Sequence, residues 1–143
     1  MRTNGLTLVE LLVALVVTGT VASIAVASMA ALRERTALNG ASDIVTRQIA
    51  LTRSMAVARR ETVRLTRHAS GLAIVDARDR TVATLRVGRK EDLAVDSVRV
   101  RPASLRFNAR GQAGPGSIYL WRGDRGVRLV VNFLGRVRRE SVR

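Results

Sequence analysis

The chain has 143 residues, a formal net charge of +14 at pH 7 and no cysteine. This length fits one domain with an additional segment. The lack of cysteine excludes a disulfide framework and a thiolate metal site. Aromatic residues make up only 3% of the chain, so the core must be built mainly from Val, Leu, Ile and Ala.

The positive charge is concentrated in the last third of the chain. Residues 99–143 hold 11 basic and two acidic side chains, whereas residues 1–58 hold five and three. Of the 25 cations, 24 are arginine, and Lys90 is the exception. A field of this sign attracts polyanions such as nucleic acid, anionic lipid head groups or acidic polysaccharide.

The first apolar stretch begins directly behind a lone carboxylate, Glu10. No charged residue occurs between positions 11 and 32, a run long enough to cross a bilayer as a helix. Gly5 precedes this run, whereas the small residues of an ordinary secretory signal follow the apolar core. A carboxylate beside such a segment is costly unless it is paired. The alternative is an interfacial glutamate without a partner.

The segment that follows is expected to continue the helix. Residues 33–60 contain no proline, and their apolar residues recur at roughly helical spacing. This pattern predicts an amphipathic helix that lays one face on a soluble domain, with Gly40 as its weakest point. The apolar positions expected on that face are Leu38, Ala41, Ile44, Val45, Ile49, Leu51, Ala56 and Val57.

From residue 61 onward the apolar period changes to two, which is typical of strands. Turn residues such as Gly, Pro and Asp separate the apolar segments. The strand candidates are residues 62–66, 72–75, 82–87, 94–100, 104–108, 117–122, 126–133 and 135–140. A long helix followed by antiparallel strands makes an α+β chain.

Two parts of the sequence resemble known proteins. The stretch GLTLVE at residues 5–10 resembles the class III signal of type IV pilins and type II secretion pseudopilins. Residues 107–111, 118–120 and 130–138 resemble the GspH/FimT branch of that superfamily, which comprises minor pilins and minor pseudopilins. The resemblance implies a type IV pilin-like fold. In that fold a long N-terminal helix, membrane-spanning in its first half, packs on an antiparallel β-sheet C-terminal domain.

The resemblance also implies a division of the chain and a processing step. Residues 1–5 would be a leader removed by the prepilin peptidase, which cuts between Gly5 and Leu6 and methylates the new amine of Leu6. Residues 6–32 would form the transmembrane and assembly helix, residues 33–60 its amphipathic continuation, and residues 61–143 the globular domain.

Glu10 would then be neutralised by the Leu6 amine of a neighbouring subunit. The implied partners are other pilin or pseudopilin subunits, the prepilin peptidase and the bacterial inner membrane. Before assembly the chain would cross that membrane once, with its C-terminal domain in the periplasm. After assembly it would stand in a pilus or pseudopilus. Leu6 departs from the Phe usual in the family, and the stalk proline is absent.

The C-terminal arginines form a candidate DNA-binding site. Alternation would place Arg136 and Arg138 on one face, about 7 Å apart, which roughly matches successive phosphates. Gly135, Arg136 and Arg138 also resemble the Gly-Arg-x-Arg motif through which FimT-type minor pilins contact DNA. Physical extension adds Arg139 and, more weakly, Arg122, Arg125 and Arg128.

Two aromatic residues lie near this site, and two interpretations of them stay open. Tyr119 and Trp121 alternate with apolar residues along one strand candidate. They either stack on exposed bases or cover a second apolar face, and we prefer packing.

No enzymatic site is expected, and no catalytic residue, metal ligand or cofactor is assigned. The only histidine, His68, is interpreted as a surface or structural residue. Two pairs of acids, Asp76 with Asp79 and Glu91 with Asp92, lie among arginines and are expected in solvated turns.

Three functions follow as hypotheses. The preferred one is a minor type IV pilin that binds DNA non-specifically for uptake in natural transformation. The second is a structural subunit, either a minor pseudopilin of type II secretion or a pilus-priming subunit, whose arginines dock on an acidic partner or keep the surface soluble. The third is an anchored module that binds anionic lipid.

Overall fold

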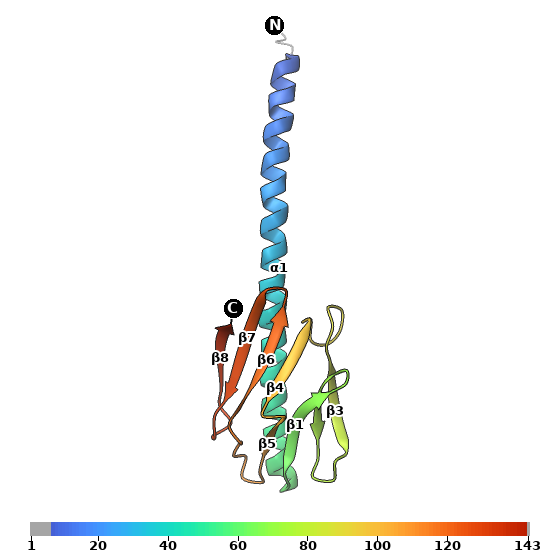
Figure 1. Cartoon of the computed structure of the whole chain (residues 1–143), viewed down its shortest axis with the longest axis vertical. Helices are drawn as coiled ribbons and strands as arrows, with labels where there is room; N and C mark the ends of the chain where they lie inside the picture. Colours follow the sequence, from blue (N-terminus) through green and yellow to red (C-terminus); the bar gives the residue numbers. More distant parts are fainter. Residues whose placement is uncertain (1–6, 143) are drawn as a thin grey trace. The chain divides into compact units, whose positions relative to one another are not determined.

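The structure is a computed structural model that describes residues 7–142, without the side chains of residues 25, 27 and 30. The predicted cleavage site between Gly5 and Leu6 lies outside the described residues. The chain divides into two units, Met1–Arg35 and Thr36–Arg143. One helix, α1 (Leu8–Arg59), contributes to both units (Figure 1).

The N-terminus of α1 is closed by reciprocal hydrogen bonds between Thr7 and Glu10. The Thr7 backbone N–H and hydroxyl both donate to Glu10 Oε2 at 3.1 Å, and the Glu10 N–H donates to Thr7 Oγ1 at 3.3 Å. This arrangement is a capping box, and a negative charge is favourable at this end of a helix. Glu10 therefore has a partner within its own chain, and its pairing with a neighbour's Leu6 amine stays a prediction.

Much of the apolar surface of the first unit is exposed. The exposed large apolar side chains here are Leu8, Val9, Leu11, Leu12, Val13, Leu15, Val16, Val17, Val21, Ile24, Val26, Met29 and Leu32. We expected residues 6–32 to cross a bilayer. Within the part of the chain that the structure describes, no helix meets the length and apolarity expected of a membrane span.

In the second unit, α1 buries one stripe of side chains in the domain core. The stripe has the i, i+3/i+4 spacing of an amphipathic helix and comprises Leu38, Ala41, Ser42, Val45, Ile49, Thr52 and Ala56. Its two hydroxyls are satisfied within the helix, since Ser42 Oγ donates to the Leu38 carbonyl at 2.8 Å and Thr52 Oγ1 to the Gln48 carbonyl at 2.7 Å.

The helix prediction holds with three corrections. Leu51 and Val57 are each 46% exposed, because they lie beside the buried stripe. Ile44 is only partly buried and packs at the edge of the core. The helix runs through Gly40 without interruption, and a Cβ there would meet nothing within 4 Å apart from the adjoining backbone of the helix itself.

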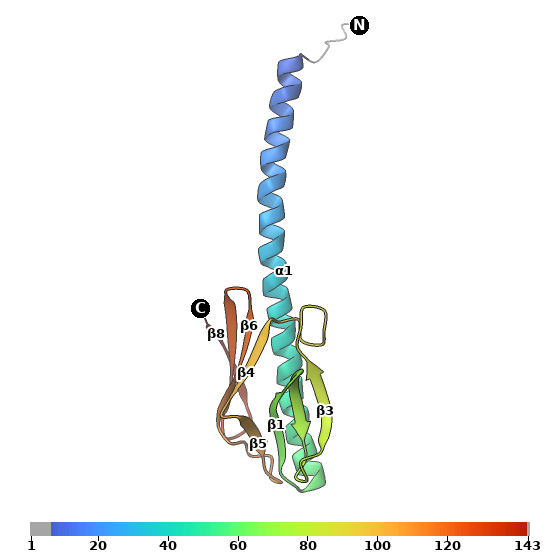
Figure 2. The same cartoon turned by 45° about the vertical axis from the view of Figure 1, so that its right-hand side comes forward.

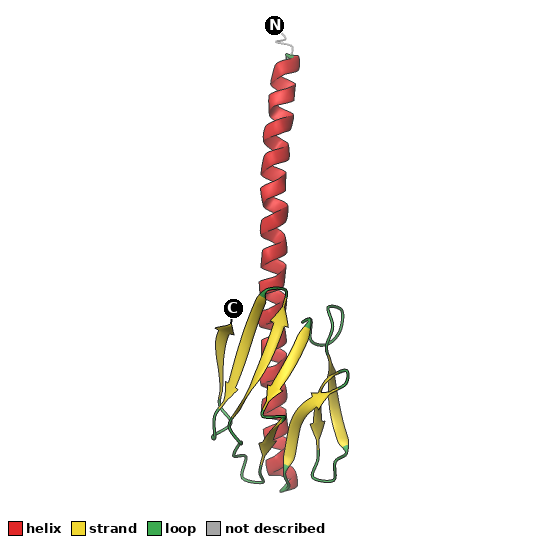
Figure 3. Ribbon diagram, in the orientation of Figure 1, coloured by secondary structure: helices red, strands yellow, loops and turns green. Residues whose placement is uncertain are grey.

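The eight strands form two antiparallel four-stranded sheets with the orders β3-β2-β1-β5 and β4-β6-β7-β8. Both sheets lie alongside the C-terminal part of α1 (Figures 2 and 3). The strands are β1 (Val63–His68), β2 (Gly71–Val75), β3 (Thr81–Arg86), β4 (Ser97–Arg101), β5 (Ser104–Phe107), β6 (Gly116–Arg122), β7 (Arg125–Val131) and β8 (Val137–Val142).

The expected antiparallel β-sheet domain is confirmed, but its strands form two sheets, and the chain crosses from one sheet to the other. After β4 the chain passes a cis Arg101–Pro102 bond, and β5 then pairs with β1. β4 itself pairs with β6, which follows later in the sequence. Alternation of apolar residues identifies strands but does not specify their partners, so this division was not visible in the sequence.

A turn with a left-handed glycine leads into β8. The Asn132 side-chain oxygen accepts the Arg136 backbone N–H at 2.9 Å, and the Asn132 N–H donates to the Arg136 carbonyl at 3.1 Å. Gly135 has φ +74° and donates its N–H to the Asn132 carbonyl at 2.9 Å. The predicted strand 135–140 therefore begins two residues later, at Val137.

The turn after β5 has the same design. Asn108 Oδ1 accepts the Gln112 N–H at 3.0 Å, and Gly111 has φ +74°. A Cβ on Gly111 would lie 3.1 Å from Arg53 Nε, and a Cβ on Gly135 would lie 3.2 Å from Arg53 Cδ. The Arg53 side chain of α1 thus contacts both turns. We did not find this repeated Asn-x-x-Gly pattern in the sequence.

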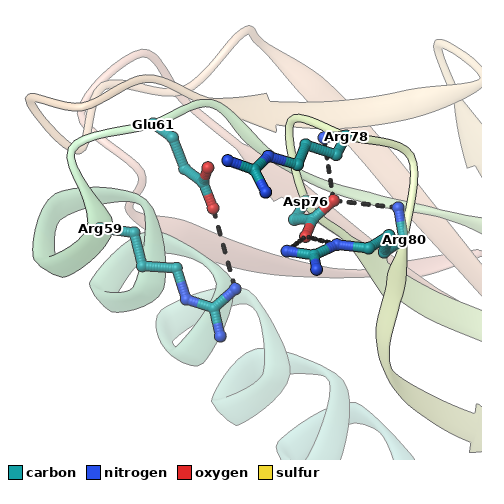
Figure 4. Close-up of polar contacts among 5 residues, drawn as sticks. All are labelled: Arg59, Glu61, Asp76, Arg78 and Arg80. Atoms are coloured by element: carbon teal, nitrogen blue, oxygen red, sulfur yellow. Dashed lines mark hydrogen bonds and ion pairs between the residues drawn. The ribbon is translucent and has the colours of Figure 1, made fainter.

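The turn between β2 and β3 is closed by a buried carboxylate, Asp76 (Figure 4). Asp76 Oδ1 accepts the backbone N–H groups of Arg78 and Arg80, and Oδ2 accepts the Arg80 Nε–H, each at 2.9 Å. These hydrogen bonds, above all the one from the Arg80 backbone, lower the pKa of Asp76 below its usual value. The expected solvated turn is therefore wrong for Asp76, whose role is structural.

We predict that acid destabilises the fold partly through Asp76 and Asp96. A hydrogen bond from the Arg89 side chain and another from the Gly123 backbone lower the pKa of Asp96. Carboxyls with a lowered folded-state pKa stabilise the fold above the unfolded value of about 4, and this contribution is lost as the pH falls through the folded values. The measurement is urea unfolding of the full chain in non-ionic detergent, followed by Trp121 fluorescence. The urea concentration at the midpoint should decrease when the pH is lowered below about 4. An unchanged pH profile in an Asp76→Asn, Asp96→Asn double variant would contradict this.

We also predict that Gly135→Ala destabilises the domain. The positive φ costs a residue with a Cβ about 1–2 kcal/mol, and the new methyl group would press on Arg53. The loss should be measured as a lower urea midpoint of the full chain in non-ionic detergent. Gly114→Ala is the matched control, because a Cβ there meets no atom within 4 Å. Equal losses in the two variants would refute the assigned role of Gly135.

Candidate functional site

The second sheet has one face on the core and one face away from it. Val98, Ile118, Leu120 and Leu129 are buried, so the residues between them on the strands point outward. We call the outward-pointing set the outer sheet face. It consists of Ser97, Arg99, Arg101, Ser117, Tyr119, Trp121, Gly126, Arg128, Val130, Arg138, Glu140 and Val142.

The strand register arranges this face in rows of directly opposite residues. One row is made of Arg99, Tyr119, Arg128 and Glu140, and the next of Arg101, Ser117, Val130 and Arg138. Since neighbouring strands lie about 4.8 Å apart, each row spans about 14 Å. The outer sheet face carries four arginines and one carboxylate, so it is strongly positive.

Arg128 is held at the centre of the face. Its Nε donates to Ser117 Oγ at 3.1 Å, and its guanidinium carbon lies 5.6 Å from the centroid of the Tyr119 ring. Glu140 Oε2 lies 3.7 Å from Arg128 Nη1, and Glu140 Oε1 lies 3.6 Å from Arg138 Nε. One carboxylate is therefore shared by two guanidiniums, and their charges are only partly compensated.

The structure exposes the two arginines of the predicted motif. Arg136 is exposed in the turn before β8, and Arg138 is exposed on β8, with 81% of its side chain accessible. Gly135 belongs to the turn and shapes the backbone beside them. The candidate site is therefore taken to be the outer sheet face together with Arg136 in the turn that leads into β8.

Arg139 lies on the opposite side of β8. It is in register with the core residue Leu129, and its Nη2 is 2.5 Å from Asp43 Oδ1 on α1. This ion pair links β8, one of the two edge strands of its sheet, to the helix. Adding Arg139 to the predicted site ignored the alternation that separates it from Arg138.

Two of the weaker candidates also point to the core side. Arg122 and Arg125 are paired at the end of the β6–β7 hairpin, on the same face as Leu120 and Val127. Arg122 donates through Nη1 to the Ala94 carbonyl, while its buried Nε has no hydrogen-bond partner in the structure. Of the three weaker candidates, only Arg128 lies on the outer sheet face.

The two arginines that β4 adds to the outer sheet face were missed in the sequence analysis. Arg99 and Arg101 are exposed on this strand, while Val98 and Val100 face the core. The alternation in SVRVR was the available signal, but the strand was expected to begin at residue 94 and its arginines were not considered. They come together with Arg128 and Arg138 only through the pairing of β4 with β6.

Tyr119 and Trp121 are half-buried on the outer sheet face and not in the core. A Cβ on Gly126 would lie 2.8 Å from Trp121 Cε3 and Cζ3, so the indole packs on the bare Cα of that glycine. Both aromatic rings are therefore part of the arginine-rich surface.

The other titratable candidates have local partners. His68 is exposed, with Nδ1 3.0 Å from Ser70 Oγ. Asp79 pairs with Arg64, and Glu91 lies 2.9 Å from Arg86. Asp92 Oδ2 accepts the Arg86 backbone N–H at 2.9 Å. Among the described residues, no group of three or more His, Cys, Asp or Glu side chains is placed to hold a metal ion.

Solved structures share this fold. The crystal structure of the type IV minor pilin FimU from Pseudomonas aeruginosa is 24% identical, covers 75% of this chain and 90% of its own, and has a TM-score of 0.57. The minor pseudopilin EpsH from the type 2 secretion system of Vibrio cholerae is 11% identical and has a TM-score of 0.51. The match covers 73% of this chain and 96% of the EpsH chain. No curated protein sequence matches significantly.

Two family models match the sequence. The prokaryotic N-terminal methylation motif matches residues 1–26. The model for the type II transport protein GspH matches residues 41–135, which is more than half of the chain. This match covers α1 from Ala41 and all strands before β8. The chain belongs to the GspH family of minor pilins and pseudopilins.

Proposed function

We propose that this chain is a minor type IV pilin of the FimT type, which binds DNA without sequence preference during DNA uptake in natural transformation. The observation that carries the proposal is the exposed pair Arg136 and Arg138, of which Arg138 is one of the four arginines that share the outer sheet face with a single carboxylate. Arginine binds phosphate in a bidentate manner, and backbone contacts of this kind carry no sequence information. The proposal assigns the chain no catalytic role.

Two of the five proposed DNA contacts, Arg136 and Arg138, lie beyond the residues that the GspH model matches. The GspH match ends at residue 135, directly before Arg136 and β8. Arg139, Arg122 and Arg125 are not proposed as principal contacts, because they face the core side of the sheet. The proposed contacts are Arg99, Arg101, Arg128, Arg136 and Arg138, with Gly135 shaping the turn.

We predict that Arg136→Ala combined with Arg138→Ala weakens binding of mixed-sequence duplex DNA and makes it less dependent on salt. Each lost phosphate contact should reduce the slope of log K against log salt by about one, so the double variant should lose about two. The measurement is fluorescence anisotropy of labelled duplex with the full chain in non-ionic detergent, over a series of salt concentrations.

The matched control for charge is Arg78→Ala combined with Arg110→Ala. Both side chains are exposed, lie away from the outer sheet face and contribute only their backbone N–H groups to their turns. This control should bind duplex DNA almost as the unmodified chain does. Equal affinity and equal salt slope in the two double variants would remove the proposed site.

The proposal includes processing and assembly at the inner membrane. The peptidase removes residues 1–5, Leu6 becomes the methylated terminus, and the globular domain stands in the periplasm before the chain joins a filament. The methylation motif matched at residues 1–26 supports this step. In the filament, Glu10 exchanges its contacts with Thr7 for the Leu6 amine of a neighbouring subunit.

We predict that the protein isolated from its own cells begins at Leu6 with a methylated amine. Intact-mass and N-terminal peptide mass spectrometry measure this directly. Gly5→Leu should leave the leader in place, because a small residue is then missing from the cleavage site. A wild-type protein that still begins at Met1 would contradict the proposed processing.

A structural role is the second candidate, either as a minor pseudopilin of type II secretion or as a pilus-priming subunit. It is favoured by the GspH match and by the shared fold of EpsH. In this case the outer sheet face docks on an acidic surface of another subunit. A deletion strain that loses protein secretion and keeps transformation would favour this candidate, while the reverse result would favour DNA uptake.

A further inference from the structure

The outer sheet face combines aromatic and basic side chains in a way that duplex DNA cannot fully use. In a duplex the bases are stacked inside, and a protein surface meets mostly phosphate and sugar. Tyr119 and Trp121 place two aromatic rings among the arginines of this face. Basic surfaces that carry aromatic rings bind single strands, because unpaired bases stack on the rings.

We propose that the outer sheet face binds single-stranded DNA, with Trp121 as the platform on which a base stacks. This proposal rests on the proposed function and specifies the form of DNA that the site takes. The phosphate contacts are supplied by the arginines of three strands, Arg99, Arg101, Arg128 and Arg138.

The surroundings of Trp121 leave the indole accessible. In its row, Trp121 stands between Ser97 on β4 and Gly126 on β7. The indole ring packs on Gly126, since a Cβ on this glycine would lie only 2.8 Å from Trp121 Cε3 and Cζ3. Neither neighbour has a side chain large enough to cover the ring, which is half-buried. The ring is thus held in place on Gly126 and remains partly accessible to a ligand.

The second aromatic position is already covered by a planar cation. The Arg128 guanidinium lies 5.6 Å from the Tyr119 ring centroid and is held by Ser117 and Glu140. Bases also stack on arginine planes, so this pair offers a second stacking position. Tyr119 and Trp121 are about 7 Å apart along β6, twice the spacing of about 3.4 Å per nucleotide in a duplex strand. This separation fits the splayed bases of an extended single strand.

The arginines are placed on both sides of the aromatic pair. Arg99 and Arg101 lie on one edge strand of the sheet, and Arg138 lies on the other. A DNA strand that runs along β6 over the two rings therefore has positive charge on both of its sides. An acidic protein segment would use the same charges but would gain nothing from stacking on the half-buried indole, which is why we favour nucleic acid over an acidic partner.

The test compares an oligothymidylate with a mixed-sequence duplex of the same number of phosphates, using the full chain in non-ionic detergent. Trp121 is the only tryptophan, so its fluorescence reports on the site directly. We expect the oligothymidylate to bind more tightly than the duplex and to quench this fluorescence, whereas the duplex leaves it nearly unchanged.

Trp121→Leu keeps an apolar side chain on Gly126 and removes the stacking surface. It should weaken oligothymidylate binding about tenfold, measured by anisotropy of the labelled oligonucleotide, and weaken duplex binding far less. Phe133→Leu is the matched control, because this aromatic residue is 56% exposed outside the outer sheet face. It should bind both DNA forms as the unmodified chain does.

Several results would overturn the proposal, and they separate it from the proposed function. Equal affinity for the two DNA forms, or unchanged Trp121 fluorescence at saturation, refutes single-strand binding while DNA binding itself stands. Binding of neither DNA refutes both proposals. Displacement of the oligothymidylate by polyglutamate at equal charge concentration assigns the face to an acidic partner. If Trp121→Leu does not fold, the fluorescence comparison of the unmodified chain decides.

Discussion

The domain depends on one packing interaction, the burial of a single stripe of α1 between two antiparallel sheets. Val45 and Ile49 are fully buried at its centre, and residues from both sheets join the same core. Because one face of the β4-β6-β7-β8 sheet is used for this packing, the period of two sends every second residue of its strands outward. The arginines on the outer sheet face therefore follow from the core: where the valines of β4 point inward, its arginines must point away.

The same constraint explains which expectations were correct. The continuation of α1, most of its buried residues and the approximate positions of the strands follow from local periodicity, which the sequence displays directly. The division into two sheets depends on β5 pairing with β1 across a long stretch of chain, and local patterns do not contain that information. Arg99 and Arg101 were not assigned to the candidate site, because β4 is connected to β8 only through β6 and β7, and this strand order is also not contained in local patterns.

Other differences arise from contacts of single side chains. Arg139 was grouped with Arg138 by proximity in sequence, although adjacent strand residues face opposite ways, and it pairs with Asp43. Asp76 was expected in solvent, but it is buried by the turn that it closes. Composition indicates a basic surface, whereas the geometry decides which guanidiniums are available and which hold the fold together. Five arginines on or beside one face are accessible, and Arg122 and Arg139 are engaged elsewhere.

The edge position of β8 has a consequence for how members of this family can diverge. No residue of β8 is fully buried, and the strand is held by its ladder with β7, by the partly buried Val137 and by the Arg139–Asp43 pair. Substitutions on its outward side leave the core intact, so natural selection can change the charge of this strand at little cost to folding. The last strand is thus a region where a structural subunit can acquire or lose a ligand while its scaffold persists.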